Sequence, residues 1–211
     1  LVVTANYQSR GSGQRGNLWE SLIGENLLIS VIVEPNIPAK NQFLLSKCVS
    51  LALYDLLTLH TDNVSIKWPN DILIGKQKVA GILIQNILKG KEITHSVIGI
   101  GLNVNQTEFK AYSPQATSLK LLLNKTFDIS IIQEKLLKCL AERLKQLRSD
   151  VDQEKEYLSA LFLNNKVASF ESKDQEFMGI IKGVDQGGKL CIQLEDDNVI
   201  IFDNQEVNFL F

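Results

Sequence analysis

Residues Ser65–Leu88 read SIKWPNDILIGKQKVAGILIQNIL, and this stretch predicts the centre of a β-sheet. The runs 65–74 and 78–88 are rich in apolar residues, and the polar run GKQK (75–78) marks the turn between them. Two such runs joined by a short polar turn are typical of a hairpin. Proline has no N–H to donate to a neighbouring strand, so Pro69 is poorly placed within a central strand. The stretch therefore predicts two paired strands with an irregular point at KWPND (67–71).

Further strands and helices are predicted on both sides of this hairpin. Runs rich in β-branched and apolar residues predict strands over 1–7, 26–34 and 95–105. Apolar residues spaced at close to 3.6 residues predict helices over 41–60, 130–151 and 153–163. Ser130 and Gln133 have the spacing of a capping box at the start of the long helix.

The texture of the sequence changes at residue 164. From there the chain has short β-like runs, KVASF, FMGIIKGV, KLCIQL and VIIF, separated by polar turns. We therefore expect two domains, 1–163 and 164–211. An all-β segment this short is near the lower size limit for independent folding, so it should pack on the preceding domain.

Composition places the chain among soluble globular proteins. It has 211 residues, of which 45% are hydrophobic and 22% charged, and a formal net charge of −2. This balance gives no global electrostatic case for nucleic-acid binding. No run approaches the length of a membrane span. The three cysteines are far apart and outside any CxxC spacing, which predicts reduced thiols in the cytoplasm.

The ends of the sequence carry a further expectation. The chain begins with Leu1, and its single methionine is Met178, so we expect further residues upstream.

The stretch SRGSGQRGNLW (9–19), here called the glycine loop, has three glycines within six residues. Glycine adopts positive φ and lets the backbone approach a ligand closely, so the loop could wrap an anion or a small molecule with its N–H groups. Glycine clusters are equally ordinary in mobile surface turns. Composition alone leaves both interpretations open.

The KWPND segment combines a cation, an aromatic ring, an amide and a carboxylate within five residues. One interpretation is a functional site. The other is a strand bulge in which Trp68 packs in the core while Lys67 and Asp71 are solvated.

The same choice arises at Lys78 and at the glycines of IGIGLNVN (98–105). Lys78 follows a turn and is either a point charge for phosphate or carboxylate, or a solubilising turn lysine. Gly99 and Gly101 either relieve packing or let the strand pass beneath a flat ligand, with Asn103 and Asn105 offering amide contacts.

Several common chemistries find no support in the sequence. His60 and His95 have no second ligand at a metal-binding spacing. Neither a GxSxG elbow nor a GxxxxGK[ST] phosphate loop is present.

Four segments, QSRGSGQRGNLWES, KWPND, KVAGILI and GIGLNVNQ, occur in this order and are followed by ATSL and a small β segment. In this order they resemble biotin protein ligase over the whole chain. The resemblance implies an α+β fold: a mixed β-sheet flanked by helices, with a small C-terminal SH3-like β-barrel. It also implies that biotin and MgATP form biotinyl-5′-AMP, which then biotinylates a lysine of a biotin carboxyl carrier protein domain.

The resemblance also assigns residues. It implies catalytic roles for Lys67, Asp71 and Lys78, with Asp71 also placed to bind Mg²⁺. It implies biotin contacts for Gln8, Gly11, Ser12, Gly13, Gln14, Lys78 and Gly81. It implies nucleotide contacts for Arg15, Trp19, Asn70, Gly99, Gly101 and Asn103.

The sequence departs from the family pattern GRGRxGRxW in the glycine loop. Ser12, Gln14 and Asn17 stand where the pattern has arginines, which leaves Arg15. Loop closure should therefore depend on backbone and amide contacts, and the phosphate charge should fall mainly to Lys78 and Mg²⁺, with Arg15 as the remaining loop cation. The family's Ser/Thr-Thr-Asn segment has no counterpart here, so we expect weak biotin binding by the chain as written.

Three alternatives stay open at this level. A lipoate ligase or octanoyltransferase would acylate a similar carrier lysine on a related fold. The chain could also be the ligase domain of a biotin-responsive repressor, although no DNA-binding segment is visible in it. The third alternative is a binding module without catalysis. Separately from these alternatives, exposed sheet edges would allow a homodimer.

Overall fold

A computed structural model describes residues 1–111, 114–149 and 151–211. Its large sheet has the strand order β1-β4-β9-β8-β7-β6, and the short β5 also pairs with β9. The strands are β1 (Val2–Ala5), β4 (Asn26–Val33), β5 (Ile37–Pro38), β6 (Val64–Lys67), β7 (Asp71–Ile74), β8 (Gln77–Lys89) and β9 (Glu92–Asn103). Every pairing between these named strands is antiparallel, so the sheet is not the mixed sheet that was expected. Hairpins join β6, β7, β8 and β9 in succession.

The stretch that predicted one hairpin forms two. The segment 65–74 was expected to be a single strand, but its chain reverses at Trp68–Asn70, and Lys67 then pairs with Asp71. Proline and asparagine are turn-forming residues, and here their turn chemistry outweighs the apolar run around them. The second reversal, at 75–76, is the predicted one.

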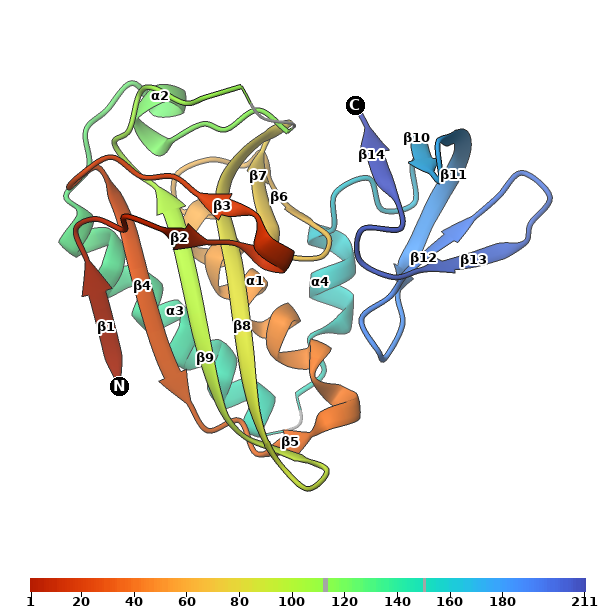
Figure 1. The fold of residues 1–211 in the computed structure, drawn as a ribbon, viewed down its shortest axis with the longest axis horizontal. Coiled ribbons are helices and arrows are strands. Elements are labelled where there is room, and N and C mark those ends of the chain that lie inside the picture. The colour runs from red at the N-terminus through yellow and green to blue at the C-terminus, as the bar shows by residue number, and fades with distance from the viewer. Residues whose placement is uncertain (112–113, 150) are drawn as a thin grey trace.

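The helices are α1 (Phe43–Thr58), α2 (Leu119–Leu123), α3 (Ile129–Arg148) and α4 (Glu154–Ala160). Figure 1 shows α1 and α3 behind the sheet, and the glycine loop, with β2 and β3, in front of it. The apolar core lies between α1 and the sheet, so the opposite face is left for a site.

The start of α3 differs from the prediction. Asp128 is its N-cap, and the Asp128 carboxylate accepts a 2.8 Å hydrogen bond from the Ser130 backbone N–H. The predicted capping box at Ser130 and Gln133 is therefore wrong, since a better acceptor lies two residues earlier. The cysteines are free thiols, as predicted.

The C-terminal segment forms an antiparallel sheet of five strands in the order β13-β12-β11-β10-β14. The strands are β10 (Val167–Ser172), β11 (Gln175–Val184), β12 (Leu190–Gln193), β13 (Val199–Phe202) and β14 (Asn208–Leu210). No pairing among the described residues joins β13 to β14, so the sheet is open where a closed barrel was expected.

The C-terminal sheet packs on the preceding part of the chain, as its small size predicted. The Trp68 indole N–H donates a 2.9 Å hydrogen bond to the Gly188 carbonyl. Gly188 has φ +94°, and a Cβ there would lie 2.6 Å from the Phe43 ring. Only glycine fits this junction without strain. Among the described residues, no helix has the length and apolarity to cross a membrane.

Candidate active site

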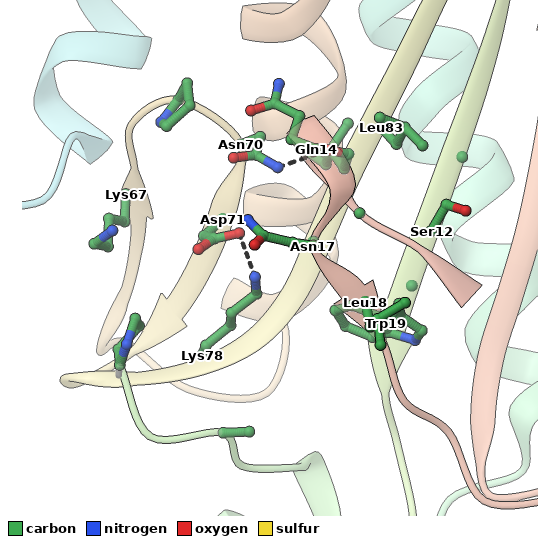
Figure 2. Close-up of a pocket in the computed structure, with 18 of the residues that line it drawn as sticks. Ser12, Gln14, Asn17, Leu18, Trp19, Lys67, Asn70, Asp71, Lys78 and Leu83 are labelled. Atoms are coloured by element: carbon green, nitrogen blue, oxygen red, sulfur yellow. Dashed lines mark hydrogen bonds and ion pairs between the residues drawn. The ribbon is translucent and has the colours of Figure 1, made fainter. Parts of the chain in front are cut away.

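A cleft of about 1110 Å³ lies between the large sheet, the glycine loop and the C-terminal sheet. Figure 2 shows the side chains that line it from KWPND and from the glycine loop, facing one another. Its volume is slightly above the usual range for a single small-molecule site, which is sufficient for two ligands of moderate size.

KWPND forms the turn between β6 and β7. Trp68 is 2% exposed and packs in the core, as the structural interpretation expected. Asn70 is bound to β8 twice, because its Nδ2 donates to the Ile82 carbonyl and its own carbonyl accepts from the Ile82 N–H, both at 2.9 Å. The turn is thus rigid, and it presents Lys67 and Asp71 at the cleft.

Lys78 and Asp71 form an ion pair in which Nζ and Oδ1 are 2.6 Å apart, with side chains 27% and 13% exposed. A bulge in the β7–β8 pairing, opposite Ile72 and Leu73, changes the register just where Lys78 lies. The Lys78 backbone is also held on both sides, by Gln115 and Thr117. Lys78 is therefore a fixed cation in the cleft and not a mobile turn lysine (Figure 2).

Lys67 has a different environment from Lys78. Its side chain is half-buried, and Nζ lies 4.8 Å from the centroid of the Phe209 ring on β14. Burial lowers the pKa of Lys67, the Asp71 charge raises it, and the Lys78 charge lowers it further. The ammonium is stabilised mainly by one carboxylate and one ring face.

The glycine loop is a small hairpin and not an irregular turn. β2 (Gly11–Ser12) pairs with β3 (Leu18–Trp19), and the 3₁₀ turn η1 (Gln14–Gly16) joins them. The Gly13 N–H donates to the Asn17 carbonyl at 2.7 Å. A Cβ on Gly11 would lie 2.3 Å from the Trp19 carbonyl oxygen, so this strand pair requires glycine. Arg15 lies in η1, and its side chain is outside the described part of the structure.

Trp19 of the hairpin lies on two paired glycines of the sheet. Gly81 on β8 is directly opposite Gly101 on β9. A Cβ would lie 3.0 Å from the Trp19 ring at Gly81 and 2.4 Å from it at Gly101. At Gly99 the nearest atom would be 3.5 Å away, which is ordinary contact. Gly101 thus makes room for an aromatic ring, whereas Gly99 does not.

Two polar atoms in this region have no partner among the described residues: Trp19 Nε1 and Asn103 Oδ1. Asn103 is 3% exposed, and its Nδ2 donates to the Thr117 carbonyl at 2.9 Å. Asn105, predicted to share its role, is instead bound at both amide atoms to the Phe127 backbone. Asn103 therefore offers the cleft a buried acceptor, while Asn105 is structural.

The structure brings most of the predicted site residues together. The cleft is lined by Gln8, Ser12, Gly13, Gln14, Trp19, Lys67, Asn70, Asp71, Lys78, Gly81, Gly99, Gly101 and Asn103. Gly11 does not line it, because it packs within the hairpin.

The sequence prediction missed the wall that the C-terminal sheet contributes. Asn204, Asn208, Phe209 and Phe211 line the same cleft as the predicted residues. Their sequence carries no local motif that would have identified them. Only the fold brings them to the cleft.

The fit of Mg²⁺ depends on the nucleotide. No group of three or more His, Cys, Asp or Glu residues that could hold a metal is found in the described ranges. The Asp71 carboxylate is a single hard oxygen donor beside a cation. One carboxylate fits Mg²⁺ in the mode in which substrate phosphates and water supply most of the ligands.

Comparisons with known proteins identify relatives of the whole chain. A model of the biotin/lipoate A/B protein ligase family matches residues 1–103. A biotin–[acetyl-CoA-carboxylase] ligase of Mycobacterium tuberculosis is 30% identical over 210 residues, covering 95% of this chain and 76% of that protein. A bifunctional ligase/repressor of Escherichia coli is 29% identical, covering 93% of this chain and 62% of its own length.

The fold is also similar to solved structures. Biotin protein ligase from Aquifex aeolicus, in complex with biotin and ATP, has a TM-score of 0.74 and 24% identity, with 99% of this chain and 88% of that chain covered. The similarity at this level of identity shows a shared α+β fold.

Proposed function

This chain belongs to the biotin/lipoate A/B protein ligase family, and from that premise we propose that it is a biotin–[acetyl-CoA-carboxylase] ligase. It activates biotin with ATP to biotinyl-5′-AMP and pyrophosphate. It then transfers the biotinyl group to a lysine amine of a carrier protein domain. The family model and the relative from Mycobacterium tuberculosis confirm the resemblance that the motifs indicated.

The observation that carries the reaction is the ion pair of Lys78 and Asp71 opposite the glycine loop (Figure 2). When the biotin carboxylate attacks the α-phosphorus, two anions must approach each other and pyrophosphate must leave. A preorganised cation at that point stabilises the charge that develops, and it needs no reorganisation during the reaction. Lys78 is such a cation, because both its backbone and its ammonium are held.

The remaining assignments divide the cleft between the two substrates. We propose that biotin lies against the glycine loop and Gly81, in contact with Gln8, Ser12, Gly13, Gln14 and Lys78. We propose that the nucleotide contacts Arg15, Trp19, Asn70, Gly99, Gly101 and Asn103. The unpaired Asn103 oxygen supports this, since it can accept a hydrogen bond from a nucleotide amine.

Two charged groups and the lid complete the proposal. Mg²⁺, when bound with ATP, neutralises phosphate charge, and Asp71 is the residue of this chain that would ligate it. Lys67 contributes a second positive charge. The glycine loop acts as a lid that excludes water from the mixed anhydride.

In the second half-reaction the carrier amine attacks the carbonyl carbon of biotinyl-5′-AMP. A C–N bond forms, the C–O bond to AMP breaks, and AMP leaves as the phosphate anion. The amine loses its proton to solvent. Lys78 again lies beside the departing phosphate.

Three further proposals concern the domain division, the oligomeric state and the cellular location. The open C-terminal sheet, 164–211, is proposed to be a separate SH3-like domain on the catalytic domain, 1–163. The edge strand β1 is exposed at all four residues, which supports a homodimer formed along this edge. The setting is proposed to be the cytoplasm.

The test of the function is transfer to a purified biotin carrier domain. With biotin and MgATP, the full chain should give a product that streptavidin detects, and omission of ATP should abolish it. Lipoate and octanoate are supplied in competition. Preferential transfer of either acid, or no transfer while adenylate also fails to form, would overturn the proposal.

A further inference from the structure

The glycine loop is tied to the C-terminal sheet by a hydrogen bond between two amides. Asn204 lies in the turn between β13 and β14, and its Nδ2 donates to Gln14 Oε1 at 2.7 Å across 190 residues of sequence. Both side chains are half-buried and line the cleft. The loop that covers one substrate is thus held by a residue from the far end of the chain.

The turn that carries Asn204 is itself braced. The Asn204 backbone N–H donates to the Asp203 carboxylate, and the Asp203 backbone N–H donates to Glu206, both at 2.7 Å. Lys189 pairs with Asp203 at 3.4 Å. A side chain presented by such a turn is preorganised, so less entropy is lost when it binds the loop.

The identity of residue 14 decides whether this hydrogen bond can form. Glutamine has an amide oxygen that accepts from the Asn204 amide. An arginine, which the family pattern places here, has five N–H donors and no acceptor, so it could bind Asn204 only through the Asn204 amide oxygen. Gln14 is therefore the acceptor that lets Asn204 donate to the loop.

We propose that Asn204 is a positioning residue, which holds the glycine loop closed over the cleft through Gln14. Its consequence for catalysis rests on the proposed ligase function. Asn204 touches neither reacting atom. It sets the fraction of time for which the lid excludes water from biotinyl-5′-AMP, so its loss increases hydrolysis of the adenylate more than it slows formation of the adenylate.

The chain offers a matched control for this role. Gln186 Nε2 donates to Asn41 Oδ1 at 2.8 Å, which is also an amide–amide hydrogen bond between the C-terminal segment and the catalytic part. It does not involve the glycine loop. Asn204→Ala and Gln186→Ala thus remove the same chemistry from the same junction, and only the first releases the lid.

The experiment compares the full-length wild type with these two variants in two assays. The first is the rate of tryptic cleavage after Arg15, which needs no activity. The second is the rate of biotinyl-5′-AMP hydrolysis without carrier, relative to its rate of formation. Asn204→Ala should increase cleavage and relative hydrolysis about fivefold, as expected for the loss of one net hydrogen bond. Gln186→Ala should change neither.

A rescue separates positioning from general weakening of the fold. Gln14→Asn shortens one side of the amide pair by one methylene and should open the lid, and adding Asn204→Gln restores the summed length and should restore protection from trypsin. Equal effects of Asn204→Ala and Gln186→Ala, no effect of Asn204→Ala, or no rescue in the double variant would each overturn the proposal. A wild type that makes no adenylate would contradict the ligase function instead, and the cleavage assay would still test the contact.

Discussion

The two tryptophans of the chain lie in the two walls of the cleft, and their surroundings are opposite in kind. Trp68, in KWPND, is 2% exposed, and its indole N–H is bonded to Gly188. Trp19, in the glycine loop, is half-buried, lies on glycines of the sheet, and has an indole N–H without a partner among the described residues. One wall is built into the core, and the other rests on a surface.

The difference indicates that the two walls of the cleft differ in rigidity. A buried aromatic residue whose N–H is bonded to the C-terminal segment holds its neighbours in place, so KWPND fixes Lys67 and Asp71. The Trp19 ring rests on the backbone of two glycines, so it can move away without disrupting the core. We therefore expect the wall that contains KWPND to hold the charged groups in place and the glycine loop to adjust to the ligand.

The largest expected effect is on stability, and it tests the comparison directly. Trp68→Ala should lower the free energy of unfolding by about 3–5 kcal/mol, because it leaves a cavity and an unpaired Gly188 carbonyl. Trp19→Ala should lower it by under about 1 kcal/mol. Urea unfolding of both variants measures this. Similar losses in the two variants would contradict the division into two walls.

The next effect is on catalysis in the rigid wall. Lys78→Ala should slow adenylate formation by roughly a hundredfold or more, as for the loss of one preorganised electrostatic partner. Its unfolding should change little. The neighbouring Lys76, which is exposed in the same turn, provides the control, since Lys76→Ala should leave pyrophosphate release near the wild-type rate. Wild-type pyrophosphate release by Lys78→Ala would refute the role of Lys78.

The third test displaces the Trp19 ring of the glycine loop. Gly101→Ala places a methyl group where Trp19 lies, and should cost about 1–3 kcal/mol unless the ring moves away. We expect the ring to move, which would change tryptophan fluorescence in a Trp68→Phe background. Gly99→Ala, with ordinary contact distances, should change neither fluorescence nor stability. Matching behaviour of the two variants would show that Trp19 does not rest on Gly101.

The smallest effect concerns Lys67 and its dependence on pH. The groups facing it are Asp71, Lys78 and the Phe209 ring, and burial lowers its pKa below the ordinary 10.5. Between the folded and unfolded pKa values the unfolded chain binds more protons, so wild-type stability should rise with pH in that window.

Lys67→Met keeps the contact with Phe209 but carries no charge. It should gain under about 1 kcal/mol at neutral pH, and the gain should shrink as pH approaches 10.5. Urea unfolding of both proteins at the two pH values measures the difference. A gain that grows with pH would contradict the assigned environment.

Sequence reasoning predicted what depends on local pattern and missed what depends on tertiary contact. The apolar runs around Ile72 and Ile82 predicted strands, because alternation and turn chemistry act over a few residues. The reversal at Pro69 was misjudged, since an apolar run with one proline fits either a bulge or a turn.

The cleft shows the same limit. Its motif residues were predicted, yet the pattern could not distinguish Gly101, which meets Trp19, from Gly99, which does not. Nor could it predict Asn204, because nothing local to Asn204 indicates that Gln14 lies beside it.

The Trp68–Gly188 and Asn204–Gln14 hydrogen bonds join residues 120 and 190 positions apart. Contacts of such separation form late during refolding, because a long loop must close before they contribute. The hairpins β6–β7 and β7–β8 can form earlier, from neighbouring residues. A refolding chain should therefore form its large sheet before the glycine loop closes over the cleft. Biotin transfer activity should return more slowly than the far-ultraviolet circular dichroism signal.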